Sequence, residues 1–160
     1  MNIIICRVWD LDEAMLQPVD ALVSISDPGD QEPNVQHLGL PVLPLVFHDA
    51  CERDEGIFHL PQAWHLKQLW AFLDRHQPAT LLHCTAGVSR SPGMALAALS
   101  WLGYLPDSEL VHQVLAVQPL AQPNSRIVRL LDELTGRDVQ RALQAALPGW
   151  LTEDEECEPD

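Results

Sequence analysis

The most constraining feature of the sequence is a segment in which an apolar run, a short loop and a helix-like run follow one another. Residues 79–82 are apolar apart from one threonine, and residues 93–99 are small or apolar residues that suit a helix. Between these runs lie Cys84 and Arg90, separated by five uncharged residues. A strand, a tight loop and a helix N-terminus in this order gather backbone N–H groups around an anion. The segment therefore predicts an anion-binding loop at the carboxyl end of a buried strand.

The two ends of this loop carry side chains suited to phosphate-ester cleavage. Thiols beside cations at helix N-termini ionise more readily than free thiols, so Cys84 is a candidate nucleophile. The planar guanidinium of Arg90 can bind two phosphoryl oxygens at once and stabilise the charge of the transition state. A glycine in the loop permits a special backbone conformation or a close approach. We expect the phosphoryl group to contact the loop residues Thr85, Ala86, Gly87, Val88, Ser89 and Arg90.

The motif His-Cys-x-x-Gly-x-x-Arg-Ser, residues 83–91, resembles the signature loop of the cysteine-dependent protein tyrosine phosphatases. Its Ala-Gly-x-Ser-Arg-Ser form is most similar to the dual-specificity branch, as in a small tyrosine phosphatase of prokaryotic type. The resemblance implies a phosphomonoester hydrolase that forms a cysteinyl-phosphate intermediate and needs no cofactor. The implied substrate is a phosphorylated protein, with phosphotyrosine alone or also phosphoserine and phosphothreonine, or a small aryl phosphate. A binding module that keeps the loop but turns over little is the alternative.

An aspartate upstream of the cysteine protonates the leaving group in the family that the motif resembles. Asp49, 35 residues before Cys84 and directly after an apolar run, matches the dual-specificity pattern. Asp54, deeper in the same loop, is the alternative general acid, and both carboxylates could instead belong to a solvated acidic loop. Asn124, in the segment Gln-Pro-Asn, matches a turn that supports the signature loop in this branch; a plain helix N-cap is the simpler interpretation.

Two residues beside Cys84 and Arg90 are candidates for supporting roles. Ser91 is placed to hydrogen-bond the sulfur and help it leave, or to cap the following helix. His83 is expected to orient the loop by hydrogen bonding rather than to transfer a proton. The remaining histidines have no metal-ligand spacing with cysteines or carboxylates, so no metal site is predicted.

Hydrophobic periodicity predicts an α/β fold with a small, mostly parallel sheet flanked by helices. Buried strands are expected in the first half, with the third strand at an edge because prolines border it. Helices dominate the second half, and the one after the loop is apolar nearly all round, as a central helix would be. The predicted strands are 3–8, 20–26, 41–47 and 80–83, and the predicted helices are 12–17, 62–76, 91–103, 107–117, 125–135 and 137–147.

The charge and composition of the chain exclude some classes of binding partner. The net charge of −14 disfavours binding to nucleic acid and to anionic membranes, and no stretch is apolar enough for a membrane helix. The loop also has no lysines to hold the extra phosphates of a phosphoinositide. Four scattered cysteines and the absence of a secretory leader favour a reducing cytoplasm. We expect one domain over 1–150 and a disordered, solubilising acidic tail over 151–160; an interaction tail for a basic partner is the alternative.

Overall fold

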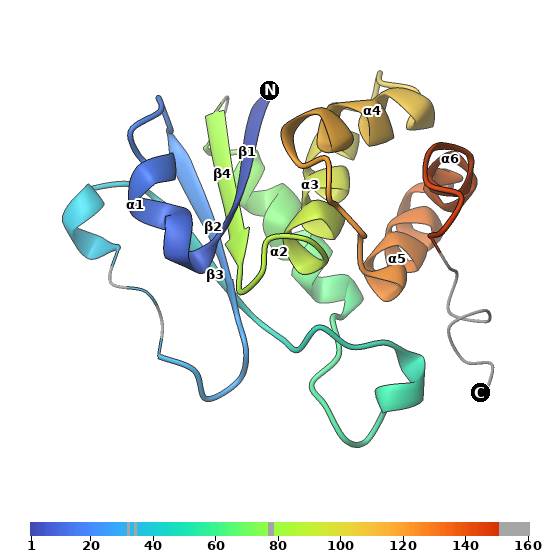
Figure 1. Ribbon diagram of the computed structural model, residues 1–160, viewed down its shortest axis with the longest axis horizontal. Helices are drawn as coiled ribbons and strands as arrows, with labels where there is room; N and C mark the ends of the chain where they lie inside the picture. The colour runs from blue at the N-terminus through green and yellow to red at the C-terminus, as the bar shows by residue number, and fades with distance from the viewer. Residues whose placement is uncertain (32, 34, 77–78, 151–160) are drawn as a thin grey trace.

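The computed structural model describes residues 1–31, 33, 35–76 and 79–150, and the predicted acidic tail lies outside this range. A four-stranded sheet forms its centre, in the order β1 (Asn2–Arg7), β4 (Ala79–Cys84), β2 (Ala21–Ser26), β3 (Val42–Val46). Every strand pair in the described residues is parallel (Figure 1). The two central strands are the most buried, which is why their sequences are mostly apolar. The predicted α/β fold is therefore confirmed.

Strand β3 lies at an edge of the sheet, as its prolines predicted. Pro44 is inside this strand and cannot donate a hydrogen bond, but an edge strand has one unpaired side where that donor is not needed. The strand ends at Val46, and residues 47–62 then form a long excursion to the N-terminus of α2 (Figure 1). This excursion contains both candidate general acids.

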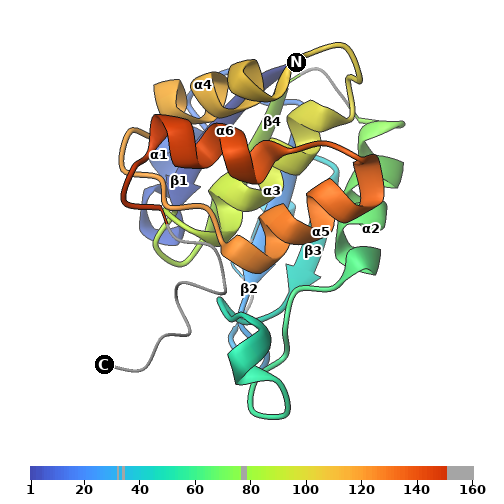
Figure 2. The ribbon, with the colours of Figure 1, turned by 90° about the vertical axis from the view of Figure 1, so that its right-hand side faces the viewer.

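Helices cover both faces of the sheet, unequally. The short helix α1 packs on one face, whereas the longer helices lie on the other (Figures 1 and 2). The helices are α1 (Leu11–Ala14), α2 (Ala63–Leu73), α3 (Arg90–Ser100), α4 (Asp107–Val117), α5 (Ser125–Thr135) and α6 (Val139–Ala146); single 3-10 turns span Val8–Asp10, Gln36–Leu38 and Glu52–Asp54. The predicted helix 12–17 is wrong in extent, because the helix ends at Ala14. Only Leu11 and Ala14 are buried in it, and Leu16, beyond its end, is 86% exposed. The other five helices are confirmed with ends shifted by up to three residues.

Helix α3 is the central helix that its apolar sequence predicted. All of its residues are buried, between the sheet on one side and α2, α4 and α5 on the others. Helix α5 approaches it so closely that a Cβ added at Gly93 would lie 3.1 Å from the side chain of Ile127. This contact brings the first turn of α5 next to the first turn of α3, where the signature loop ends. No helix among the described residues combines the length and the apolar character that crossing a bilayer requires.

Candidate active site

The signature loop lies where β4 ends and α3 begins, at the carboxyl edge of the parallel sheet. Such edges commonly carry the ligands of α/β proteins. Cys84 is the last residue of β4 and is 2% exposed. The backbone N–H of Gly87 donates a hydrogen bond to its sulfur at 3.2 Å. The sulfur therefore lies at the start of the loop, within hydrogen-bond distance of one of its amides.

The carbonyl groups of the loop are held from outside by other elements. The amide of Val8 donates to the carbonyl of Thr85 at 3.4 Å, and the side-chain amide of Gln118 donates to that of Gly87 at 3.0 Å. The amides of Gln122 and Asn124 donate to the carbonyls of Val88 and Ser89 at 2.7 and 3.1 Å. Because N–H and C=O point in opposite directions across a planar trans peptide, outward carbonyls turn the following amides inward. The loop thus forms a concave set of donors suited to an oxyanion.

A glycine is required at position 87 both for its backbone conformation and for a close approach to another strand. Its φ is +72°, a left-handed conformation that residues with a Cβ rarely adopt. A Cβ at this position would also lie 2.8 Å from the backbone carbon of Cys6, in the neighbouring strand β1. The loop therefore packs directly on β1 and leaves no room for a side chain at its middle.

Arg90 is 4% exposed, and its guanidinium is anchored on one side. Its Nη1 donates to the Asp27 carboxylate at 2.5 Å and to the Phe47 carbonyl at 2.8 Å, and Nη2 donates to Thr85 Oγ1 at 3.1 Å. Nε makes no hydrogen bond to any residue that the structure describes. The edge formed by Nε and Nη2 is the one that can bind two oxygens of an anion, and the anchoring of Nη1 orients it.

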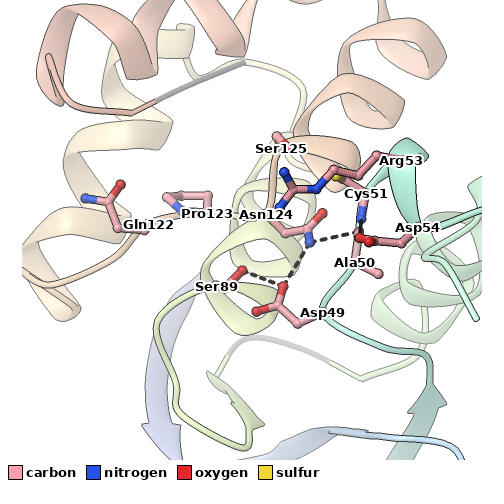
Figure 3. Close-up of a pocket in the computed structure, with 10 residues that line it drawn as sticks. All are labelled: Asp49, Ala50, Cys51, Arg53, Asp54, Ser89, Gln122, Pro123, Asn124 and Ser125. Carbon is pink, nitrogen blue, oxygen red and sulfur yellow. Dashed lines mark hydrogen bonds between the residues drawn. The ribbon is translucent and has the colours of Figure 1, made fainter. Parts of the chain in front are cut away.

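Asp49 lies against the loop, whereas Asp54 does not. The Asp49 Oδ1 atom accepts from Ser89 Oγ at 2.6 Å and from Asn124 Nδ2 at 2.9 Å (Figure 3). The carboxylate of Asp54 instead accepts from the backbone amide of Cys51 at 3.0 Å and thereby caps the 3-10 turn Glu52–Asp54. Of the two candidate general acids, only Asp49 is bonded to the signature loop.

Asn124 has both of the roles that the sequence left open, as a helix N-cap and as a support for the active-site region. Its side-chain oxygen accepts from the amide of Ile127 at 3.0 Å, so it is the N-cap of α5. Its side-chain nitrogen donates to Asp49 and also to the carbonyl of Ala50, at 3.2 Å. The cap therefore connects α5 with the candidate general acid.

His83 has an orienting position. Its Nε2 lies 2.7 Å from Ser24 Oγ in the neighbouring strand β2, and the ring is 1% exposed. Burial, together with the positive charge of Arg90, lowers the pKa of His83 to about 4, although a hydrogen bond with the backbone of Cys84 opposes the shift. The ring is consequently neutral near pH 7, so it neither donates a proton readily there nor adds positive charge beside Cys84.

Ser91 does not have either of its expected contacts. It is the second residue of α3, after the N-cap Ser89, so it does not cap the helix. Its hydroxyl is fully buried and makes no hydrogen bond within the described part of the chain, including to the Cys84 sulfur. The expected hydroxyl–sulfur bond is therefore not formed in this structure.

Two recesses adjoin the loop. A polar one of about 200 Å³ lies beside Asp49, between the 47–62 excursion and the turn before α5 (Figure 3); it is lined by Asp49, Ala50, Cys51, Arg53, Asp54, Ser89, Gln122, Pro123, Asn124 and Ser125. A more apolar one of about 220 Å³ lies beside Thr85 and His83, with Val8, Trp9, Ile25 and Pro33 among its walls. No cluster of three or more His, Cys, Asp or Glu side chains suited to a metal lies within the described residues.

Sequence patterns did not identify three residues whose side chains contact the loop or the adjoining His83: Asp27, Ser24 and Gln118. Asp27 directly follows β2, the neighbour of β4, so its position at the carboxyl end of an adjacent parallel strand was a usable signal. Ser24 is a polar residue in an apolar strand, which indicates a buried hydrogen bond. Gln118 follows the end of α4 and had no comparable signal.

Several solved structures have a similar fold, although no protein-family model and no curated protein matches the sequence. Human DUSP28 is similar over 90% of this chain and 94% of its own, at 21% identity and a TM-score of 0.67. Tk-PTP in its active form is similar over 86% and 94%, at 21% identity and a TM-score of 0.65. DUSP15 is similar over 94% and 93%, at 20% identity and a TM-score of 0.63. The chain therefore has, over most of its length and at low sequence identity, the fold of the dual-specificity phosphatases.

Proposed function

We propose that this protein hydrolyses phosphomonoesters, with Cys84 as the nucleophile. The observation that carries the proposal is the loop itself, in which a buried thiol and an anchored guanidinium stand at the two ends of a concave row of amides. The phosphatase fold supports it. A phosphorylated protein or a small aryl phosphate is the substrate class that the loop suits, and a reducing compartment such as the cytoplasm suits a nucleophilic thiol.

The reaction proceeds in two steps. The Cys84 thiolate attacks phosphorus, the bond from phosphorus to the leaving oxygen breaks, and Asp49 gives that oxygen a proton. The amides and Arg90 stabilise the charge on the equatorial oxygens. Water then attacks the cysteinyl phosphate and gives its proton to the Asp49 carboxylate, which releases phosphate and restores the thiolate.

The apolar recess beside Thr85 supports an aryl substrate in particular. Trp9 stands at its rim, 73% exposed, next to the residues that flank Cys84. An aromatic ring attached to the bound phosphate could pack against Trp9 and Pro33, whereas a serine side chain would be too short to reach them. Phosphotyrosine is therefore the preferred substrate in this proposal.

The test is vanadate-sensitive hydrolysis of an aryl phosphate by the purified protein. Turnover should disappear in Cys84→Ser and fall by at least about 10³-fold in Arg90→Lys, because lysine cannot form the two-pronged contact. Activity that survives Cys84→Ser would contradict the mechanism. Binding of a phosphopeptide without turnover by the wild-type protein would instead favour the binding-module alternative.

A further inference from the structure

One half-buried arginine of α5, Arg126, contacts two separate parts of the excursion that carries Asp49. Arg126 has a side chain that is only 12% exposed. Its Nε donates to the carbonyl of Pro61 at 2.6 Å, and its Nη2 donates to Gln62 Oε1 at 3.2 Å. Its Nη1 forms an ion pair with Glu52. A single guanidinium thus joins the middle and the end of the 47–62 segment, which the chain separates by about ten residues.

The start of the same segment is attached to the same turn of α5. Asn124, two residues before Arg126, holds Asp49 and the carbonyl of Ala50. Arg129, one turn further along the helix, forms a second ion pair with Glu52. The first turns of α5 therefore contact the segment at its beginning, middle and end, and α5 in turn packs on α3 through Gly93.

These contacts restrain the position of the Asp49 carboxylate. Glu52 is three residues after Asp49, so the ion pair with Arg126 restrains the chain close to the candidate acid. Without that guanidinium, the carbonyl of Pro61 and Oε1 of Gln62 would lose their donor, and Glu52 would keep only its ion pair with Arg129, so the segment would be restrained less tightly. Asp49 would keep its hydrogen bonds from Ser89 and Asn124, but the chain that follows it would lose one of the contacts that fix its position.

We propose that Arg126 is a positioning residue that fixes Asp49 for proton transfer to the leaving oxygen. The proposal rests on the proposed function, but it concerns only the proton donor and not the nucleophile. Arg126 touches no reacting atom; it acts through the segment. A displacement of about 1 Å at a reacting group can cost on the order of 100-fold in rate, and general-acid assistance is worth about 10²–10⁴-fold.

The experiment compares two substrates that differ in their need for a proton. Phenyl phosphate has a poor leaving group that needs protonation, whereas 2,4-dinitrophenyl phosphate has a good one that leaves without it. For Arg126→Met we expect kcat/KM for phenyl phosphate to fall about 10- to 100-fold and kcat/KM for the dinitrophenyl ester to fall less than about 3-fold. Vanadate inhibition should remain within about 2-fold, because the loop is intact.

Arg137→Met is the matched control. Arg137 has a similarly covered side chain, 15% exposed, and likewise combines an ion pair with Asp107 and a hydrogen bond to the carbonyl of Leu105. It lies between α4 and α6 rather than at the active site. Its loss should affect both substrates equally, by less than about 3-fold, even if the two variants lose similar thermal stability.

A double-mutant comparison makes the test stricter. In an Asp49→Asn background there is no proton donor to position, so Arg126→Met should cause no further leaving-group-selective loss.

If Arg126→Met fails to fold, Glu52→Gln provides the same readout from the other partner of the ion pair. An equal fall for both substrates in these variants would overturn the positioning role. Wild-type protein without turnover, or turnover that survives Cys84→Ser, would instead overturn the proposed function on which the role depends.

Discussion

His83 makes the stability of the protein depend on pH in a calculable way. Burial of the ring lowers its pKa from an ordinary value of 6.5 to about 4 in the folded state. Below pH 6.5 the unfolded chain therefore takes up a proton that the folded protein excludes. Above about pH 7 this difference in pKa has no effect on the free energy of unfolding. As the pH falls from 6.5 towards 4, it lowers that free energy progressively.

The size of the effect follows from the two pKa values. Between pH 7 and pH 5, proton uptake by the unfolded state costs the folded protein about 2 kcal/mol for one such histidine. His65, which is 2% exposed and has its pKa lowered to about 4 by burial, contributes a similar amount. The wild-type protein should therefore lose about 4 kcal/mol from these two groups over this range, in addition to any loss from carboxylates.

The substitution His83→Gln isolates one of the two contributions. Glutamine keeps a donor for Ser24 but cannot take up a proton in this range. Urea unfolding followed by tryptophan fluorescence at pH 7 and pH 5 should show that the variant loses about 2 kcal/mol less than the wild type between the two values. His112→Gln, at an exposed position, is the control and should lose as much as the wild type. Equal losses for His83→Gln and the wild type would refute the argument that this ring is buried in its neutral form.

Three further outcomes test the site. Gly87→Ala should lower stability by at least about 2 kcal/mol and vanadate affinity by at least about tenfold, as measured by thermal melting and by inhibition. Alanine disfavours the left-handed backbone at this position, and its Cβ would clash with the backbone of Cys6. Asp27→Asn should weaken vanadate binding about 3- to 30-fold, because Arg90 would lose its charged anchor; unchanged inhibition would contradict the orienting role. Trp9→Ala should raise KM for an aryl phosphate about 2- to 10-fold and leave KM for an alkyl phosphate unchanged, which steady-state kinetics can compare directly.

Local patterns were sufficient to predict the sheet and most of the helices. Strands β2 and β4 are buried on both faces, so their sequences are mostly apolar and do not alternate with exposed polar residues. The helix α5 has a clear apolar stripe and a capping asparagine, and its predicted ends are those of the structure. The helix predicted at 12–17 failed because a one-turn helix has too little buried surface for periodicity to reveal its end.

The nucleophile and its loop were predictable because they are contiguous in the chain. Of the residues that hold the loop in place, Asn124 was indicated by its Gln-Pro-Asn segment, but the others were not predicted, because their contacts join distant segments. Asp27 meets Arg90 across 63 residues, and Gln118 meets Gly87 across 31. No local pattern encodes such pairings; they depend on which strands are neighbours and on where α4 ends. The unbonded hydroxyl of Ser91 was also unpredictable, since it depends on the exact turn at which α3 begins.

The carbonyls of the signature loop are held in part by Gln118, Gln122 and Asn124, which follow Cys84 by more than 30 residues. During synthesis on the ribosome, the thiol therefore emerges well before the groups that shape its surroundings. A nascent chain that ends with α3 would carry an ordinary cysteine and an arginine without a fixed orientation. Reactivity of the sulfur should consequently arise late, only once the segment preceding α5 has left the exit tunnel and packed against the loop.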